Sequence, residues 1–277
     1  MYGKYWGLRE KPFENTPNPQ FVYYSKKHEE ALMRVMYAIK EQKGAAMLSG
    51  EYGSGKTLLS RIVIDELIKN KIYEVALVTY PQLSSLQLMQ ELIYQLESSQ
   101  INENNKAILL HRFQDRVYNN FMEGKRTVLI IDEAQAIQDK ETFEELRLLL
   151  NFQLNDKFLL TLILIGQPEL INNINSIPQL EQRMAVKFHL EALDRDETER
   201  YIQHRLAVAG RQEPIFTKES LGLIYEYSRG IPRKINNVCD TALLIGFGQE
   251  VKELGEEILK YVIGDLTKKV DAYAKDV

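Results

Sequence analysis

The stretch that decides the fold reads Gly50-Glu51-Tyr52-Gly53-Ser54-Gly55-Lys56-Thr57. It matches the phosphate-loop pattern G-x-x-x-x-G-K-[ST], in which glycines let the backbone turn tightly and approach phosphate oxygens. The N–H groups of such a loop point inward at the N-terminus of a helix, whose dipole favours anions. We therefore expect ATP and Mg²⁺ here, with Lys56 at the β- and γ-phosphates and the Thr57 hydroxyl on the metal. The residues assigned to the nucleotide are Gly50, Gly53, Ser54, Gly55, Lys56, Thr57 and Leu58.

Short apolar runs alternate with amphipathic segments on both sides of this loop. Residues 45–49 predict a strand that leads into the loop, and residues 57–69 predict the helix that follows it. In that helix Leu58, Ile62 and Leu67 are the expected core positions. Further strands are expected at residues 74–80, 128–131, 159–165 and 186–190. Apolar residues recur at helical spacing over 32–39, 86–96, 110–121 and 143–154. This alternation is typical of an α/β fold with a parallel sheet covered on both faces.

The rhythm changes beyond residue 191. Helical patterns dominate there, at residues 194–208, 218–227, 232–247 and 256–266, with Thr217 as a predicted N-cap and Pro232 in a first helical turn. Residues 1–28 are rich in aromatics and proline. We therefore expect three parts: an N-terminal arm over 1–28 packing near the nucleotide, an ATPase core over 29–190 and a small helical domain over 191–277.

Composition excludes several classes of protein. The 277 residues carry a net charge of −4, which gives no support for a broadly cationic surface of the kind that clamps nucleic acid. The single cysteine, Cys239, forms no intrachain disulfide and fits a reducing compartment. The start of the chain lacks the apolar run of a secretory signal, and the longest apolar stretch, 158–166, is too short to span a bilayer as a helix. We expect a cytoplasmic protein, or one peripheral at the inner membrane.

Two adjacent carboxylates end the apolar run of residues 128–131. Ligands of open α/β sheets bind at the carboxyl ends of strands, so Asp132 and Glu133 are placed for chemistry on the nucleotide. Asp132 is the expected partner of Mg²⁺, and Glu133 is the expected base for a water that attacks the γ-phosphate. The alternative, a charged strand end that meets solvent, loses weight beside a phosphate loop.

Further stretches narrow the interpretation. They are Asp132-Glu133-Ala134-Gln135, Gly166-Gln167-Pro168-Glu169-Leu170, Gly230-Ile231-Pro232-Arg233 and, in the arm, Pro12-Phe13, Pro19-Gln20-Phe21, Ser25, His28 and Ala31-Leu32. Together they resemble the AAA+ ATPases of the general secretion pathway protein A (ExeA-like) family. The resemblance covers nearly the whole chain, and these stretches are much narrower signals than the phosphate loop, which is specific only to a superfamily.

The resemblance implies a P-loop NTPase (AAA+) fold, with a five-stranded parallel sheet and a C-terminal all-helical lid. It implies that Gln167 is the sensor-1 residue, oriented toward the attacking water or the γ-phosphate, although an amide that caps a loop is the alternative. It implies that Arg183 is an arginine finger for a neighbouring subunit's nucleotide, against an ordinary surface salt bridge. Arg233 matches sensor 2, which would couple the lid to the phosphates.

The arm offers two readings. Phe13, Phe21 and Tyr23, with Val22 nearby, either form walls for adenine or plug a hydrophobic hole under a loop. Longer members of the family continue into a membrane helix and a periplasmic region, whereas this chain ends at Val277. It therefore resembles the stand-alone branch found with mannose-sensitive pilus biogenesis and exopolysaccharide export, although a shortened piece of a longer member would look the same.

Three functions compete. The first is an ATPase that drives or regulates an assembly at the inner membrane, such as a secretion, pilus or polysaccharide-export system. Arg183 would then make an ATP-dependent homo-oligomer, a ring or a dimer, its active form. The second is a DNA-associated AAA+ ATPase of the transposition-regulator type, which the acidic charge balance disfavours. The third is a nucleotide-gated binding module with little turnover, against which the intact Glu133 argues.

Overall fold

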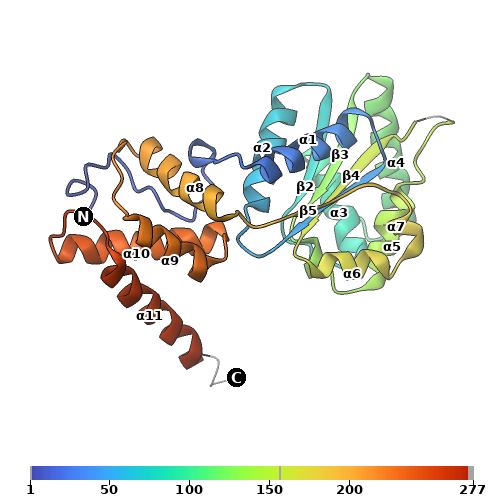
Figure 1. The fold of residues 1–277 in the computed structure, drawn as a ribbon. Coiled ribbons are helices and arrows are strands. Elements are labelled where there is room, and N and C mark those ends of the chain that lie inside the picture. The colour runs from blue at the N-terminus through green and yellow to red at the C-terminus, as the bar shows by residue number, and fades with distance from the viewer. Residues whose placement is uncertain (1, 156, 274–277) are drawn as a thin grey trace. The chain divides into compact units, whose positions relative to one another are not determined.

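The structure, a computed structural model, describes residues 2–155 and 157–273, with side chains as far as residue 268. The chain forms two compact units, each with its own core (Figure 1). Unit 1 comprises Met1–Ser25, Tyr52–Gly55 and Glu191–Val277, and unit 2 comprises Lys26–Glu51 and Lys56–Leu190. The N-terminal arm thus belongs to the same unit as the C-terminal helices.

Unit 2 is built on one parallel sheet of five strands in the order β2-β3-β4-β1-β5. This confirms the fold class and the strand number expected from the sequence. Each strand falls on one of the predicted apolar runs. The strands are β1 (Ala45–Gly50), β2 (Tyr73–Val78), β3 (Arg126–Ile131), β4 (Leu160–Gly166) and β5 (Met184–Leu190).

Helices cover both faces of this sheet, as Figure 1 shows. One core lies between the sheet and α1 and α2, and the other lies between the opposite face and α3 to α7. Two of these helices, α6 and α7, lie in a stretch where the sequence analysis placed no helix. The helices of unit 2 are α1 (Lys26–Lys40), α2 (Lys56–Lys69), α3 (Ser85–Glu97), α4 (Lys106–Met122), α5 (Lys140–Leu149), α6 (Glu169–Asn175) and α7 (Pro178–Glu181), with a 3-10 turn η2 (Ala134–Ala136) after β3.

The buried face of α2 differs from the expected one. Leu59, Val63 and Leu67 are fully buried, whereas Leu58 and Ile62 are only partly buried. The expectation for Leu67 was right, and Ile62 packs against the same core from a partly buried position, whereas Leu59 takes the place expected for Leu58. The reason is that apolar residues occupy a wide arc of this helix, so their spacing alone does not fix which side faces the sheet.

Unit 1 packs the arm onto a helical bundle. Trp6 is buried in its core, and the indole Nε1–H donates to the Leu243 carbonyl at 2.9 Å. The Thr217 side chain caps its helix and Pro232 opens the next, which confirms both predictions. The elements are η1 (Pro19–Phe21), α8 (Arg195–Val208), α9 (Lys218–Ser228), α10 (Pro232–Gly248) and α11 (Glu256–Tyr273). Throughout the described residues, every helix falls short of the combined length and apolarity that crossing a bilayer requires.

Candidate functional site

The predicted phosphate loop connects β1 to α2. Gly53 has a φ of 81° and Gly55 a φ of 106°, a region that favours glycine, so the chain turns where the pattern requires it. Lys56 is buried at the start of α2, and its ammonium donates to the Gly50 carbonyl at 2.7 Å and to the Glu51 carbonyl at 2.9 Å. The lysine therefore ties the first residues of the loop to the helix that follows.

Asp132 comes to the same place from a distant part of the sequence. It follows β3, which is separated from β1 by β4 alone. The Asp132 carboxylate accepts a hydrogen bond from the Thr57 side chain and feels the positive charge of Lys56. The structure thus brings together the three residues that the sequence assigned to the triphosphate and its metal ion.

The electrostatics of Asp132 fit a cation. Burial raises the pKa of this carboxyl most, the neighbouring charge of Glu133 raises it further, and Lys56 and the Thr57 hydroxyl lower it. A buried carboxylate beside a second carboxylate is short of positive charge. A divalent ion held by the Thr57 hydroxyl and the Asp132 carboxylate would supply that charge through the oxygen ligands that Mg²⁺ prefers.

Glu133 is held by two amide side chains. Its backbone is left-handed, with a φ of 53° and a ψ of 35°, and its N–H donates to Asp132 Oδ1 at 2.9 Å. Gln135 Nε2 donates to Glu133 Oε2 at 2.6 Å, and Gln167 Nε2 lies 3.4 Å from the same oxygen. Gln135 Oε1 in turn accepts the Gln167 backbone N–H at 2.9 Å. The structure therefore joins two sequence motifs through Gln135, a residue to which the sequence analysis gave no role.

Arg183 lies between α7 and β5 and is half-buried. One terminal nitrogen donates to Asn151 Oδ1 at 2.6 Å, and the other is buried with no hydrogen-bond partner among the described residues. It makes none of the ion pairs found in the described chain, which argues against the surface salt bridge. The arginine-finger role stays a prediction, and it would require the guanidinium to leave Asn151.

Within unit 1, Arg233 contacts the phosphate-loop segment Tyr52–Gly55 directly. Its backbone N–H donates to the Gly53 carbonyl at 3.3 Å, and its guanidinium lies 4.4 Å from the centre of the Tyr52 ring. A Cβ on Gly53 would lie 2.6 Å from the Arg233 Cβ. Ser54 is buried in the same segment. Arg233, the expected sensor-2 residue, thus contacts a segment of the predicted phosphate loop.

Phe21 and Val22, in the N-terminal arm, have different surroundings. Phe21 is buried in the core of unit 1, where the Arg205 guanidinium lies 5.0 Å from the centre of its ring. Val22 is partly buried, and its N–H donates to the Pro19 carbonyl at 3.3 Å. These contacts are those of a structural plug, and an adenine-binding role for the pair stays a prediction.

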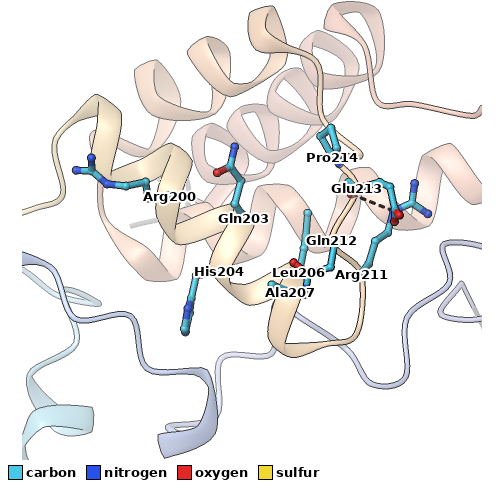
Figure 2. A pocket seen from close by; sticks show the side chains of 9 residues that line it. All are labelled: Arg200, Gln203, His204, Leu206, Ala207, Arg211, Gln212, Glu213 and Pro214. Carbon is cyan, nitrogen blue, oxygen red and sulfur yellow. Dashed lines mark hydrogen bonds between the residues drawn. The ribbon is translucent and has the colours of Figure 1, made fainter.

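Unit 1 also carries a pocket of about 460 Å³ that contains none of the predicted site residues (Figure 2). Its two arginines serve structural contacts: Arg200 donates to the Tyr23 hydroxyl, and Arg211 donates to the Glu213 and Trp6 carbonyls. The lining residues are Arg200, Gln203, His204, Leu206, Ala207, Arg211, Gln212, Glu213 and Pro214.

Comparison with known proteins places this geometry in context. Residues 39–174 match the AAA domain family. The chain is 36% identical over 251 residues to general secretion pathway protein A of Aeromonas hydrophila, an alignment that covers 90% of this chain and 45% of the relative. It is 29% identical over 147 residues to an HTH-type transcriptional regulator of Methanocaldococcus jannaschii, covering 51% of this chain and 36% of the relative. The chain thus spans less than half the length of these two curated relatives.

Solved structures share the fold. The ORC2 protein of Aeropyrum pernix, in ADPNP and ADP complexes, superposes with a TM-score of 0.66 at 18% identity, covering 92% of this chain and 71% of that one. A RuvB structure of Thermotoga maritima gives a TM-score of 0.59 at 18% identity, covering 86% and 69%. At these identities the likeness establishes the AAA+ fold alone.

Proposed function

Because the chain is an AAA domain protein related to general secretion pathway protein A, we propose that it binds and hydrolyses ATP in a Mg²⁺-dependent reaction. One observation carries the proposal. Thr57 at the start of α2 and Asp132 at the end of β3 are hydrogen-bonded beside Lys56, although they come from distant parts of the sequence. A lysine, a hydroxyl and a carboxylate at the carboxyl ends of parallel strands form a suitable set for a metal-bound triphosphate.

The proposed chemistry follows from the residues present. Lys56 exchanges its loop carbonyls for phosphate oxygens, and Thr57 and Asp132 would hold Mg²⁺. When bound, this ion would supply positive charge against the charge that develops on the phosphates. Glu133 accepts a proton from a water whose oxygen bonds to the γ-phosphorus, while the bond from that phosphorus to the leaving ADP oxygen breaks. Gln167, beside Glu133, orients the water or the γ-phosphate.

We further propose that this cycle of ATP hydrolysis drives or regulates the assembly of a cell-envelope system for secretion, pilus biogenesis or polysaccharide export. Relatedness to general secretion pathway protein A supports this role. The mannose-sensitive pilus branch is the finer form of the proposal. The active state is a homo-oligomer, a ring or a dimer, in which Arg183 of one subunit reaches the nucleotide of the next. We place this assembly in the cytoplasm or at the cytoplasmic side of the inner membrane.

Phosphate release by the purified chain tests the enzymatic claim. We expect Lys56→Ala to abolish turnover by removing ATP binding. We expect Glu133→Gln to lower the turnover rate by about 10²- to 10⁴-fold while ATP stays bound, because only the proton acceptor is lost. Lys69→Ala and Glu66→Gln are matched controls at exposed positions of α2 and should behave as the parent does. Turnover of Glu133→Gln at the parental rate would contradict the proposal.

Light scattering with and without ATP tests the assembly claim. ATP should increase the mass of the parent, and Arg183→Ala should lower turnover by weakening subunit cooperation. Mixing Arg183→Ala with Lys56→Ala should restore part of the activity, because each subunit supplies what the other lacks. The trans role is wrong if the mixture stays inactive.

Stimulation of the parental ATPase by duplex DNA, steeply reduced by salt, would instead favour the DNA-associated alternative.

A further inference from the structure

Gln135 lies where the Asp132–Gln135 motif meets the end of β4. Its Nε2 donates to Glu133 Oε2 at 2.6 Å, and its Oε1 accepts the Gln167 N–H at 2.9 Å. We propose that Gln135 is a positioning residue, which fixes the carboxylate of the hydrolytic base against the loop that carries Gln167. The inference rests on the proposed ATP hydrolysis and adds to it a residue that acts through Glu133 rather than on the nucleotide.

The Gln135 amide satisfies both of these contacts at once. The Glu133 carboxylate needs a donor and the Gln167 N–H needs an acceptor, and the two ends of one glutamine side chain supply them. A glutamate at position 135 would keep the shape and the acceptor, but it would lose the donor and place a second negative charge beside Glu133. An alanine would remove both hydrogen bonds, the one to the Glu133 carboxylate and the one from the Gln167 N–H.

Gly166, the last residue of β4, makes room for this amide. A Cβ built there would lie 2.5 Å from Gln135 Oε1 and 3.2 Å from the Gln135 backbone nitrogen. The backbone of Gly166 is not in the left-handed region, so alanine at this position meets a steric contact rather than backbone strain. A methyl group on Gly166 should therefore displace the Gln135 amide, and it would also press on Leu170 Cδ2 at 3.0 Å.

The two amides leave one side of the base open. Gln135 and Gln167 both address Glu133 Oε2, and in the described part of the chain no hydrogen bond reaches Oε1. With Oε2 held, the carboxylate presents Oε1 in one orientation to a water. In the proposed reaction Oε1 takes the water proton as the new oxygen–phosphorus bond forms and the bond to ADP breaks. Losing Gln135 frees the carboxylate to rotate, which lowers the fraction of bound complexes that react.

The test measures kcat and KM for ATP, together with the ATP dissociation constant, for Gln135→Glu and Gln135→Ala. We expect kcat to fall by about 10- to 100-fold, the range typical of outer residues that orient metal ligands and so, like Gln135, act through another side chain. KM and the dissociation constant should stay within about twofold of the parental values, because the contact matters only in the transition state. Gly166→Ala should reproduce the loss of kcat. Gln138→Glu, the same chemical change at an exposed position, is the control and should keep the parental kcat.

Melting temperatures and the Glu133→Gln variant complete the experiment. A lower kcat at an unchanged melting temperature supports positioning. Parental kcat in both Gln135 variants, with Glu133→Gln inactive, would overturn the role of Gln135 and leave the proposed function standing. A raised KM at an unchanged kcat would overturn it as well. A parental chain whose turnover does not respond to Glu133→Gln would instead overturn the proposed function, and the inference with it.

Discussion

The ionised Asp132 carboxylate should lower the stability of the folded chain, although the proposed function needs it to bind Mg²⁺. Burial and the charge of Glu133 raise the pKa of this carboxyl above its ordinary value of 3.8, so the free protein carries an ionised group that folding disfavours. We expect Asp132→Asn to raise the melting temperature near pH 7. The gain should shrink as pH falls through the raised pKa and vanish below 3.8, where the carboxyl is neutral in both the folded and the unfolded chain.

The same substitution should weaken Mg²⁺-dependent ATP binding by more than about tenfold, because a carboxylate oxygen is lost. Calorimetry at several pH values and ATP titrations with Mg²⁺ measure the two effects. Asp115→Asn, at an exposed position of α4, is the control and should change neither. A lower melting temperature for Asp132→Asn near neutral pH would contradict the electrostatic account.

Tyr52 and Arg233 suggest a competition at the phosphate loop. The guanidinium lies over the ring, and such a contact at an exposed site contributes about 0.5–1 kcal/mol. If Arg233 must leave the ring to reach a phosphate, Tyr52→Ala should tighten ATP binding by about 2- to 5-fold. Tyr52→Phe keeps the ring and should match the parent. Weaker ATP binding by Tyr52→Ala in a fluorescent-ATP titration would mean that the ring helps to present Arg233.

At the scale of elements, the junction before α10 depends on a glycine. Gly230 has a φ of +74°, and a Cβ there would lie 1.8 Å from the Leu193 carbonyl oxygen. The Leu193 N–H also donates a hydrogen bond to the Gly230 carbonyl at 3.0 Å, which holds the two backbone segments against each other. We expect Gly230→Ala to lower the unfolding free energy of unit 1 by at least about 2 kcal/mol.

Urea unfolding followed by the fluorescence of Trp6, the one tryptophan of the chain, checks this expectation in unit 1. Gly248→Ala is the matched control, since a Cβ at the end of α10 would meet nothing within 4 Å. Equal unfolding free energies for the two variants would show that the Gly230 backbone can relax.

The sequence predicted the elements better than their details. Continuous apolar runs located the five strands. The phosphate loop and the acidic pair predicted which end of the sheet carries the candidate site, and the structure brings Thr57 and Asp132 together there. The buried face of α2 was predicted only in part, because its apolar arc is wide. Short α6 and α7 escaped notice because seven and four residues hold too few turns for a period to appear. The role of Gln135 depends on where β4 ends beside β3, which no local pattern encodes.

At the scale of the whole molecule, the two units have separate cores and should respond separately to conditions. His204 belongs to unit 1, and burial lowers its pKa below the ordinary value of 6.5, against the opposing effect of the Val22 backbone. Above pH 6.5 the imidazole is neutral in both the folded and the unfolded chain. As pH falls below 6.5, the unfolded chain takes up the proton first, so the unfolding free energy of unit 1 falls until the folded pKa is passed.

Urea unfolding followed by Trp6 fluorescence, repeated at pH values from about 7.5 to about 5, measures this fall in the unfolding free energy of unit 1. The range extends at least about one unit to either side of the ordinary histidine pKa. His204→Gln should remove the part of the loss that comes from this imidazole. His111→Gln, at an exposed position of α4 in unit 2, should leave the loss as it is in the parent. An identical pH dependence for the parent and His204→Gln would exclude His204 as its source.

In the proposed function, Thr57 and Asp132, far apart in sequence, act on one metal ion bound with ATP. A double-mutant cycle on ATP affinity, measured with Mg²⁺ and with the metal chelated, tests it most directly. We predict that Thr57→Ala and Asp132→Asn each remove most of the gain in affinity that Mg²⁺ provides, and that the double variant loses no more than either alone. Losses that add, or a Mg²⁺ effect that survives in the double variant, would contradict the claim.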